Sequence, residues 1–329
     1  MRTLVAAFVA FTVGIAHASA QALHADVSVT AGTSTEEVHA GSAQARVFGE
    51  TRGLRFYAEG AWGTVDGPRS DAFGAAYPYR TRPHLMEVYA EKLFRGDRLL
   101  ASIRGGRFRT PFGIHATSDH AYVGFLRAPL IRYPGQFALS NTFLEAGANV
   151  MAGTPWLQAE ATVGMPSDEG RLVRPRGLDA VARVQGYTGA LIAGLSHIRT
   201  RPYQSRQFAH GRAVFTGIDF RWMKSGVQLR GELLRGRPFE GTRTTGGYVD
   251  AFFHVRAMGP VTAVARVEAL DYDAGRFSRY ERRATMGARV RLAHGLTAHV
   301  NVMHHPGGLY TSKATAADVA LTYTVRYSR

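Results

Sequence analysis

The feature that most constrains this chain is a set of long segments in which apolar and polar residues alternate strictly. A clear example covers residues 248–256, where one face carries Val249, Ala251, Phe253 and Val255 and the other carries Tyr248, Asp250, His254 and Arg256, together with Phe252. A period of two residues is that of a β-strand, whose successive side chains point to opposite faces. Each such segment therefore predicts a strand with one apolar and one polar face.

The same alternation recurs from about residue 22 to the end of the chain. It predicts strands over residues 22–33, 38–51, 53–64, 84–95, 98–109, 142–152, 156–166, 177–187, 190–199, 212–223, 226–236, 246–257, 260–271, 281–292, 296–305 and 315–327. Alternation is least clear in the first segment and in 190–199. Sixteen is an even number of strands, as single-chain bacterial β-barrels require.

Three further properties favour a membrane barrel over a soluble sandwich. The segments run to about ten to twelve residues, which is long for a soluble strand and suits a tilted membrane crossing. Their apolar faces consist mostly of Ala, Val, Leu and Gly, and the connections alternate between short turns and long loops. We therefore predict an all-β fold, a transmembrane antiparallel β-barrel of about sixteen strands with a long third outer loop.

The first residues have the pattern of an export signal. Arg2 precedes an apolar stretch over residues 4–15, and the small residues Ala18, Ser19 and Ala20 follow. This stretch is too short for a membrane helix, which needs about twenty residues. We expect a signal peptide over 1–20, a barrel over 21–329 and a location in the cell outer membrane. The chain has no cysteine, which excludes a disulfide-stapled domain.

In a membrane barrel the apolar face meets lipid, so the charged face must line the lumen. About sixteen strands leave an aqueous channel. The pore-lining candidates are Arg46, Arg55, Arg104, Arg127, Arg132, Arg283, Arg289 and Arg291. Two roles remain open for such charges, because they either pair with acids across strands or face the solute.

Two local expectations follow from the strand pattern. A symmetric turn over residues 223–226 would place Asp219 opposite Arg230 as a cross-strand ion pair. Arg283, Arg289 and Arg291 share a face on which Glu281 is the only acid in the same strand. We therefore expect these three arginines to form a basic stripe that attracts anions.

The longest connection, residues 110–140, is rich in apolar side chains and does not resemble a disordered tail. Folding into the lumen would narrow the pore and bring His115, His120, Arg127 or Arg132 near the constriction. The competing interpretation is a lid outside the barrel.

The residues that lead into this loop resemble a known family. The run Ile103-Arg104-Gly105-Gly106-Arg107-Phe108-Arg109-Thr110-Pro111-Phe112-Gly113 is similar to the Gly-x-Phe-Lys-x-Pro-Phe segment of the phosphate-selective porins, and residues 125–130 and 147–153 fit the same region loosely. The resemblance implies a sixteen-stranded barrel, a third outer loop folded inside it, and basic residues that conduct anions. This chain differs in its smaller size and in having only three lysines.

Several other functions are less well supported. The chain has 40 basic and 25 acidic residues, but an exported protein has little access to nucleic acid. His304-His305 has no accompanying ligand cluster, so we expect neither a metal site nor a cofactor, and no nucleophile motif indicates an enzyme. The predicted partners are outer-membrane lipid, lipopolysaccharide and small solutes, with a homotrimer as one allowed assembly. The alternative function is a structural or adhesive barrel without transport activity.

Overall fold

The computed structural model describes residues 22–66, 83–114, 124–132, 144–167, 178–200, 213–238, 242–254, 259–273, 275, 278–307 and 313–329. Within these residues the chain forms sixteen strands and one short 3₁₀ helix, η1 (Leu130–Arg132). The strands are β1 (Ala22–Ser34), β2 (Val38–Thr51), β3 (Leu54–Asp66), β4 (His84–Arg95), β5 (Leu100–Arg109), β6 (Leu144–Gly153), β7 (Leu157–Ser167), β8 (Asp179–Thr188), β9 (Leu191–Thr200), β10 (Ala213–Lys224), β11 (Val227–Arg237), β12 (Arg243–His254), β13 (Val261–Asp273), β14 (Ser278–Ala293), β15 (Leu296–His304) and β16 (Thr315–Ser328).

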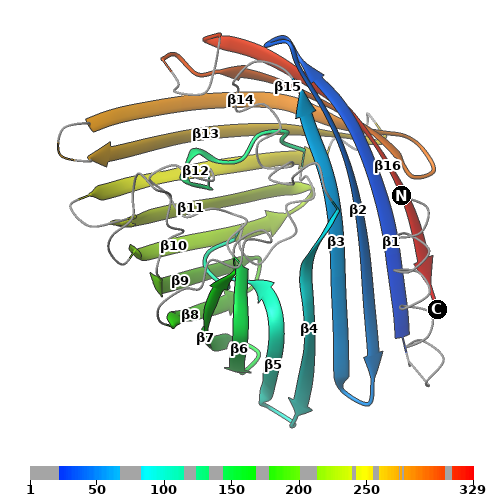
Figure 1. Cartoon of the computed structure of the whole chain (residues 1–329), viewed down its shortest axis with the longest axis vertical. Coiled ribbons are helices and arrows are strands. Elements are labelled where there is room, and N and C mark those ends of the chain that lie inside the picture. The colour runs from blue at the N-terminus through cyan, green and yellow to red at the C-terminus, as the bar shows by residue number, and fades with distance from the viewer. Residues whose placement is uncertain are drawn as a thin grey trace.

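Every strand pairs antiparallel with its neighbours in the sequence, and β1 pairs with β16 to close a barrel (Figure 1). Backbone hydrogen bonds of 2.9 Å join Leu23 and Arg329 in both directions at the seam. Closure leaves no unpaired sheet edge, which is the condition for a sheet to sit in lipid. The barrel prediction is confirmed, and each strand boundary lies within three residues of the expected one.

The two faces of the wall differ as the alternation predicts. In β12, Tyr248 and Asp250 point inward and are buried, whereas Val249 and Phe253 point outward and are each 42 % exposed. The same holds around the wall, where large apolar side chains such as Val27, Leu195 and Leu321 are exposed on the outer surface. A soluble protein does not expose so much apolar surface, so this surface suits contact with hydrocarbon.

The two ends of the barrel also differ, and we call them the short-turn end and the long-loop end. At the short-turn end β10 and β11 are joined by Ser225 and Gly226 alone, with φ values of 50° and 81°. Two successive residues with positive φ are typical of a type I′ turn, whose twist matches that of the strands. No helix within the described ranges has the length and apolar character to cross a membrane.

This tight turn corrects one expected ion pair. Lys224 pairs with Val227, so Asp219 faces Glu232 and Arg221 faces Arg230. The expected pair of Asp219 with Arg230 is therefore wrong, because it centred the turn one residue too early and so displaced the register by two residues. Asp219 instead binds Arg183 of β8 at 2.7 Å.

Candidate functional site in the barrel lumen

Part of the long connection after β5 lies inside the barrel. We call its described residues, 110–114 and 124–132, the inner strap. They are buried throughout and contact inward-facing residues of β9, β11, β13, β15 and β16. For these residues the expectation of an inward loop is confirmed, whereas His115 and His120 lie outside the described part of the chain.

Arg127 anchors the strap to the seam side of the wall. Its guanidinium binds Asp318 of β16 at 2.6 Å and Glu36, in the turn between β1 and β2, at 2.8 Å. All three side chains are almost fully buried. Two carboxylates around one guanidinium offset the cost of burying the charge only when the geometry is good, as it is here.

Backbone groups of the strap are also hydrogen-bonded to side chains of the wall. The Leu126 N–H donates to the Asn301 side chain at 2.7 Å, and the Leu130 N–H donates to Glu268 at 2.6 Å. Arg266 donates to the Arg127 carbonyl at 2.9 Å. These bonds satisfy an irregular backbone that would otherwise be buried without partners.

The other end of the strap is fixed by Arg132 and Gly113. Arg132 pairs with Glu232 of β11 and donates to the Phe112 carbonyl. Gly113 has a φ of 63°, and a Cβ atom there would overlap the Glu232 carboxylate. Glycine is therefore required at this position for both conformation and space.

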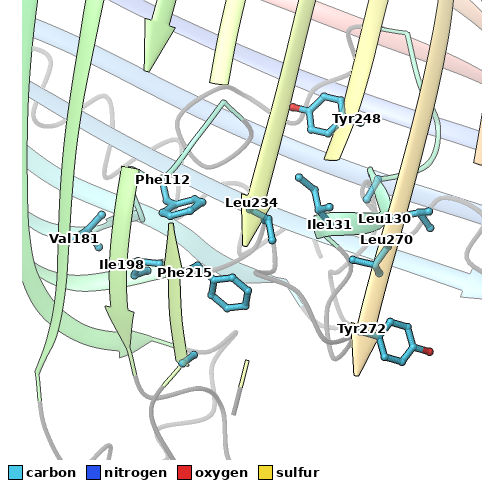
Figure 2. Packing of buried hydrophobic residues seen from close by; sticks show 12 residues of the cluster. Phe112, Leu130, Ile131, Val181, Ile198, Phe215, Leu234, Tyr248, Leu270 and Tyr272 are labelled. Carbon is cyan, nitrogen blue, oxygen red and sulfur yellow. The ribbon is translucent and has the colours of Figure 1, made fainter. Parts of the chain in front are cut away.

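Apolar side chains of the strap complete the attachment. Figure 2 shows Phe112 beside Ile198 and Phe215, and Leu130 and Ile131 near Leu270. These residues belong to one buried cluster that strap and wall share. The strap thus occupies the long-loop half of the lumen along β9 to β16.

On the opposite wall, β1 to β5, a row of charged inward residues lies next to a row of mostly aromatic ones. The register aligns Asp26, Arg46, Glu59 and Glu87 in one row and His24, Phe48, Tyr57 and Tyr89 in the next. Ion pairs run through the charged rows: Arg46 binds Asp26 at 2.9 Å, and Arg109 binds Glu59 at 2.8 Å. A cavity of ≈ 380 Å³ opens along these rows.

Two more of the predicted pore-lining residues lie on this wall. Arg55 binds Glu50 at 2.9 Å and approaches Glu91 at 3.8 Å, and Arg104 binds Glu91 at 3.1 Å. Both arginines are partly exposed to the lumen. Their charges are therefore compensated by cross-strand partners, the first of the two roles that the sequence left open.

The expected basic stripe on β14 is present only in part. Arg283 is fully buried and binds Glu268 of β13 at 2.7 Å, and it also donates to the Ala128 carbonyl of the strap. The expectation that Arg283 is a free charge is therefore wrong, because the acid that pairs with it lies on the neighbouring strand. Its role is to hold the strap.

Arg289 and Arg291 lie further toward the short-turn end of β14. Arg289 is half-buried between Thr262 and His299 of the neighbouring strands, and Arg291 is exposed opposite Thr297. Arg291 has no ion-pair partner among the residues that the structure describes. This part of the wall therefore presents positive charge to the lumen.

The structure also locates the histidines considered for a metal. His304 points outward to Thr315 at 3.0 Å, while His305 points inward to Glu281 at 3.0 Å. Adjacent residues of a strand face opposite sides of the wall, so the two rings diverge. Among the described residues no three His, Cys, Asp or Glu side chains lie close enough to hold a metal ion.

Sequence reasoning missed most of the strap's anchors. Glu36, Asn301 and Ser196 gave no signal, because each lies far from the strap in the sequence. Glu232 and Asp318 were recognisable as inward-facing acids from the alternation alone, but their partners in the loop were not. Arg109 was correctly expected as the last residue of its strand, but its ion pairs with Glu59 and Glu87 were not predicted.

Comparison with solved structures supports this architecture. No family model matches the chain, and no curated protein matches its sequence. Salmonella typhi OmpF in complex with daunomycin is similar with a TM-score of 0.65 and 12% identity, over 92% of this chain and 97% of that one. The trimer form of Vibrio cholerae OmpT is similar with a TM-score of 0.58 and 10% identity, over 93% of this chain and 100% of that one. A mutant of Rhodopseudomonas blastica porin is similar with a TM-score of 0.54 and 11% identity, over 92% of this chain and 99% of that one. At these identities the similarity establishes the fold, that of the Gram-negative outer-membrane porins.

Proposed function

We propose that this chain is an outer-membrane porin through which small solutes, anions preferentially, diffuse passively. The observation that carries the proposal is a closed barrel with an apolar outside and a charged inside that retains a cavity of ≈ 380 Å³. The side chains of a barrel of this size do not fill its interior, so an aqueous channel remains. Passive diffusion needs neither a cofactor nor a catalytic group.

The ends of the barrel support an orientation in the membrane. In outer-membrane barrels short turns face the periplasm and long loops face outward. The short-turn end, with the Ser225–Gly226 turn, would then be periplasmic and the strap would enter from outside. The predicted signal peptide over 1–20 lies outside the described residues, and export remains part of the proposal.

The preference for anions rests on Arg291 and on the other lumen arginines that have no ion pair in the described part of the chain. Arg291 is exposed, and it lies on the same inward face of β14 as Arg289. Arg221 and Arg326 also face inward at this end without an ion pair in the described part of the chain. The resemblance of residues 103–113 to phosphate-selective porins makes phosphate one solute to test.

A homotrimer and contact with lipopolysaccharide also belong to the proposal. The outward faces of β16, β1 and β2 are apolar and carry no lysine or arginine in the described residues. Such a face suits contact with a second copy of the chain, and OmpT of Vibrio cholerae has been described in a trimer form.

The zero-current potential in a KCl gradient tests the anion preference. Replacing Arg289 and Arg291 with glutamine should shift this potential toward cations, because the lumen then repels potassium less. The effect should fade at high salt, since screening acts within about 10 Å at 0.1 M. Replacing the outward-facing Arg235 and Arg237 removes the same charge outside the lumen and serves as the matched control.

Two results would oppose this proposal. An unmodified pore that already prefers potassium would exclude anion selectivity. An equal shift in both double variants would mean that surface charge, and not the stripe on β14, sets the potential.

A second candidate is a structural barrel without transport. The observation that favours it is the strap, whose buried side chains Phe112, Leu126 and Ile131 fill the long-loop half of the lumen. Conductance separates the two candidates, because a filled barrel would insert into a bilayer without passing ions.

A further inference from the structure

Five arginines point away from the barrel, near the long-loop end of one side of the wall. They are Arg199 of β9, Arg235 and Arg237 of β11, Arg243 of β12 and Arg282 of β14, which we call the outer arginine belt. Each lies on the face of its strand that further along carries exposed apolar side chains, and each is exposed. Their position is therefore independent of the lumen charges.

The strand register defines the border of the belt on the side of the short-turn end. One row across the strands contains His197, Thr216, Arg235, Thr245 and Asp271. In the next outward-facing row toward the short-turn end lie Leu195, Ile218 and Leu233, exposed by 52 %, 54 % and 50 %. Polar residues thus give way to apolar ones within a single step along β9, β10 and β11.

On β14 the border lies one row further down, at Arg282. The belt therefore follows the border at which outward polar side chains give way to exposed apolar ones.

None of the five guanidiniums has an ion-pair partner within 4.0 Å in the described residues. Arg282 contacts the ring of Tyr280, with its Cζ atom 4.6 Å from the ring centroid. Among the described residues the acids on the same surface are Asp271 and Asp273, of which Asp273 stands opposite Arg243 in the register, so positive charge is in excess. Most lumen arginines, by contrast, have a carboxylate partner, as Arg46, Arg183 and Arg283 do.

The opposite side of the barrel provides an internal contrast. The outward positions of β15, β16, β1, β2 and β3 carry no lysine or arginine in the described residues. A general excess of arginine in the sequence would not respect this division. The belt is thus a feature of one side of the barrel.

We propose that the outer arginine belt binds the phosphate-bearing headgroups of outer-leaflet lipid. An outward arginine costs about 2–4 kcal/mol at the middle of a bilayer and about 0–1 kcal/mol at the interface, so these side chains require the headgroup region. Guanidinium groups bind phosphate oxygens in a bidentate manner, and several at one height suit a sheet of phosphates. This inference rests on the proposed outer-membrane location, but it does not require transport.

Native mass spectrometry of the whole barrel, folded in neutral detergent, tests the belt. The probe is a bis-phosphorylated glucosamine lipid, compared with the same lipid after removal of its phosphates. We expect the phosphorylated lipid to bind at least about tenfold more tightly. Replacing Arg235, Arg237 and Arg243 with glutamine should abolish this difference, while replacing Arg98, Lys224 and Arg329 at the short-turn end should preserve it.

Single-channel conductance of the same variants separates this proposal from the proposed function. The belt lies outside the lumen, so replacing its arginines should leave conductance unchanged. Unchanged conductance would also confirm that the variant folds. Equal loss of lipid binding in both triple variants, or retained binding in the belt variant, would overturn the proposal. Unchanged lipid binding with an altered oligomeric state would make the belt a protein interface and would also overturn it.

Discussion

Arg283 and Arg46 both face the interior of the barrel and both bind a carboxylate, but they differ in exposure to water. The side chains of Arg283 and Glu268 are completely buried, whereas those of Arg46 and Asp26 are 19% and 24% exposed. Burial decides what the loss of one partner costs, since a carboxylate left in the interior cannot be solvated. The paired arginines of the lumen are therefore of two kinds. Those like Arg283 are buried and hold the strap, and those like Arg46 are partly exposed to water.

Replacing Arg283 with glutamine should lower the free energy of unfolding by about 3 kcal/mol, because Glu268 would lose its charged partner. Replacing Arg46 with glutamine should cost less than about 1 kcal/mol, as expected for a pair in contact with water. Urea unfolding in lipid vesicles, followed by the fluorescence of the three tryptophans, measures both. Similar costs for the two variants would mean that the strap side of the lumen is as hydrated as the other side.

At the scale of elements, the inner strap and the strands have different origins in the sequence. A strand follows from the period of its own residues, so all sixteen could be predicted from local alternation. The apolar content of residues 110–140 indicated packing, but it did not identify the wall that the loop meets. That choice depends on Glu36, Glu232 and Asp318, which come from three distant parts of the chain.

The wrong expectations for Asp219 and Arg283 both concern partners on neighbouring strands. Register depends on the turn, and a two-residue turn at Ser225–Gly226 displaces every partner of Asp219. For Arg283 the sequence indicated the acids of its own strand, whereas its partner Glu268 lies across the hairpin. Alternation reveals which face a residue occupies but not which residue stands beside it.

Deleting residues 115–136 should raise single-channel conductance, because it removes η1 and most of the strap. It should also shift selectivity toward cations, since Glu36, Asp318 and Glu232 lose Arg127 and Arg132 as partners. A short deletion within residues 201–212, which join β9 to β10, serves as the control. Unchanged conductance in a folded deletion variant would show that the strap does not limit the pore.

At the scale of the whole molecule, three surfaces divide the functions we propose. The apolar outer surface matches the hydrocarbon, the belt at the long-loop end matches headgroups, and the inner wall of paired charges borders a cavity of ≈ 380 Å³ along β1 to β5. The closed order of strands makes this division possible, because a closed sheet has no edge strand whose backbone groups lack partners. Transport then depends on whether the space beside the strap is continuous.

Single-channel recording in planar lipid bilayers tests this central claim most directly. Protein lacking residues 1–20 is folded in detergent, and a shift in gel mobility on heating verifies the folded barrel before it is added to the bilayer. We predict discrete, ohmic conductance steps that persist when Arg235 and Arg237 are replaced. A folded barrel that inserts into the bilayer, as protection from protease verifies, but gives no conductance steps would contradict the account.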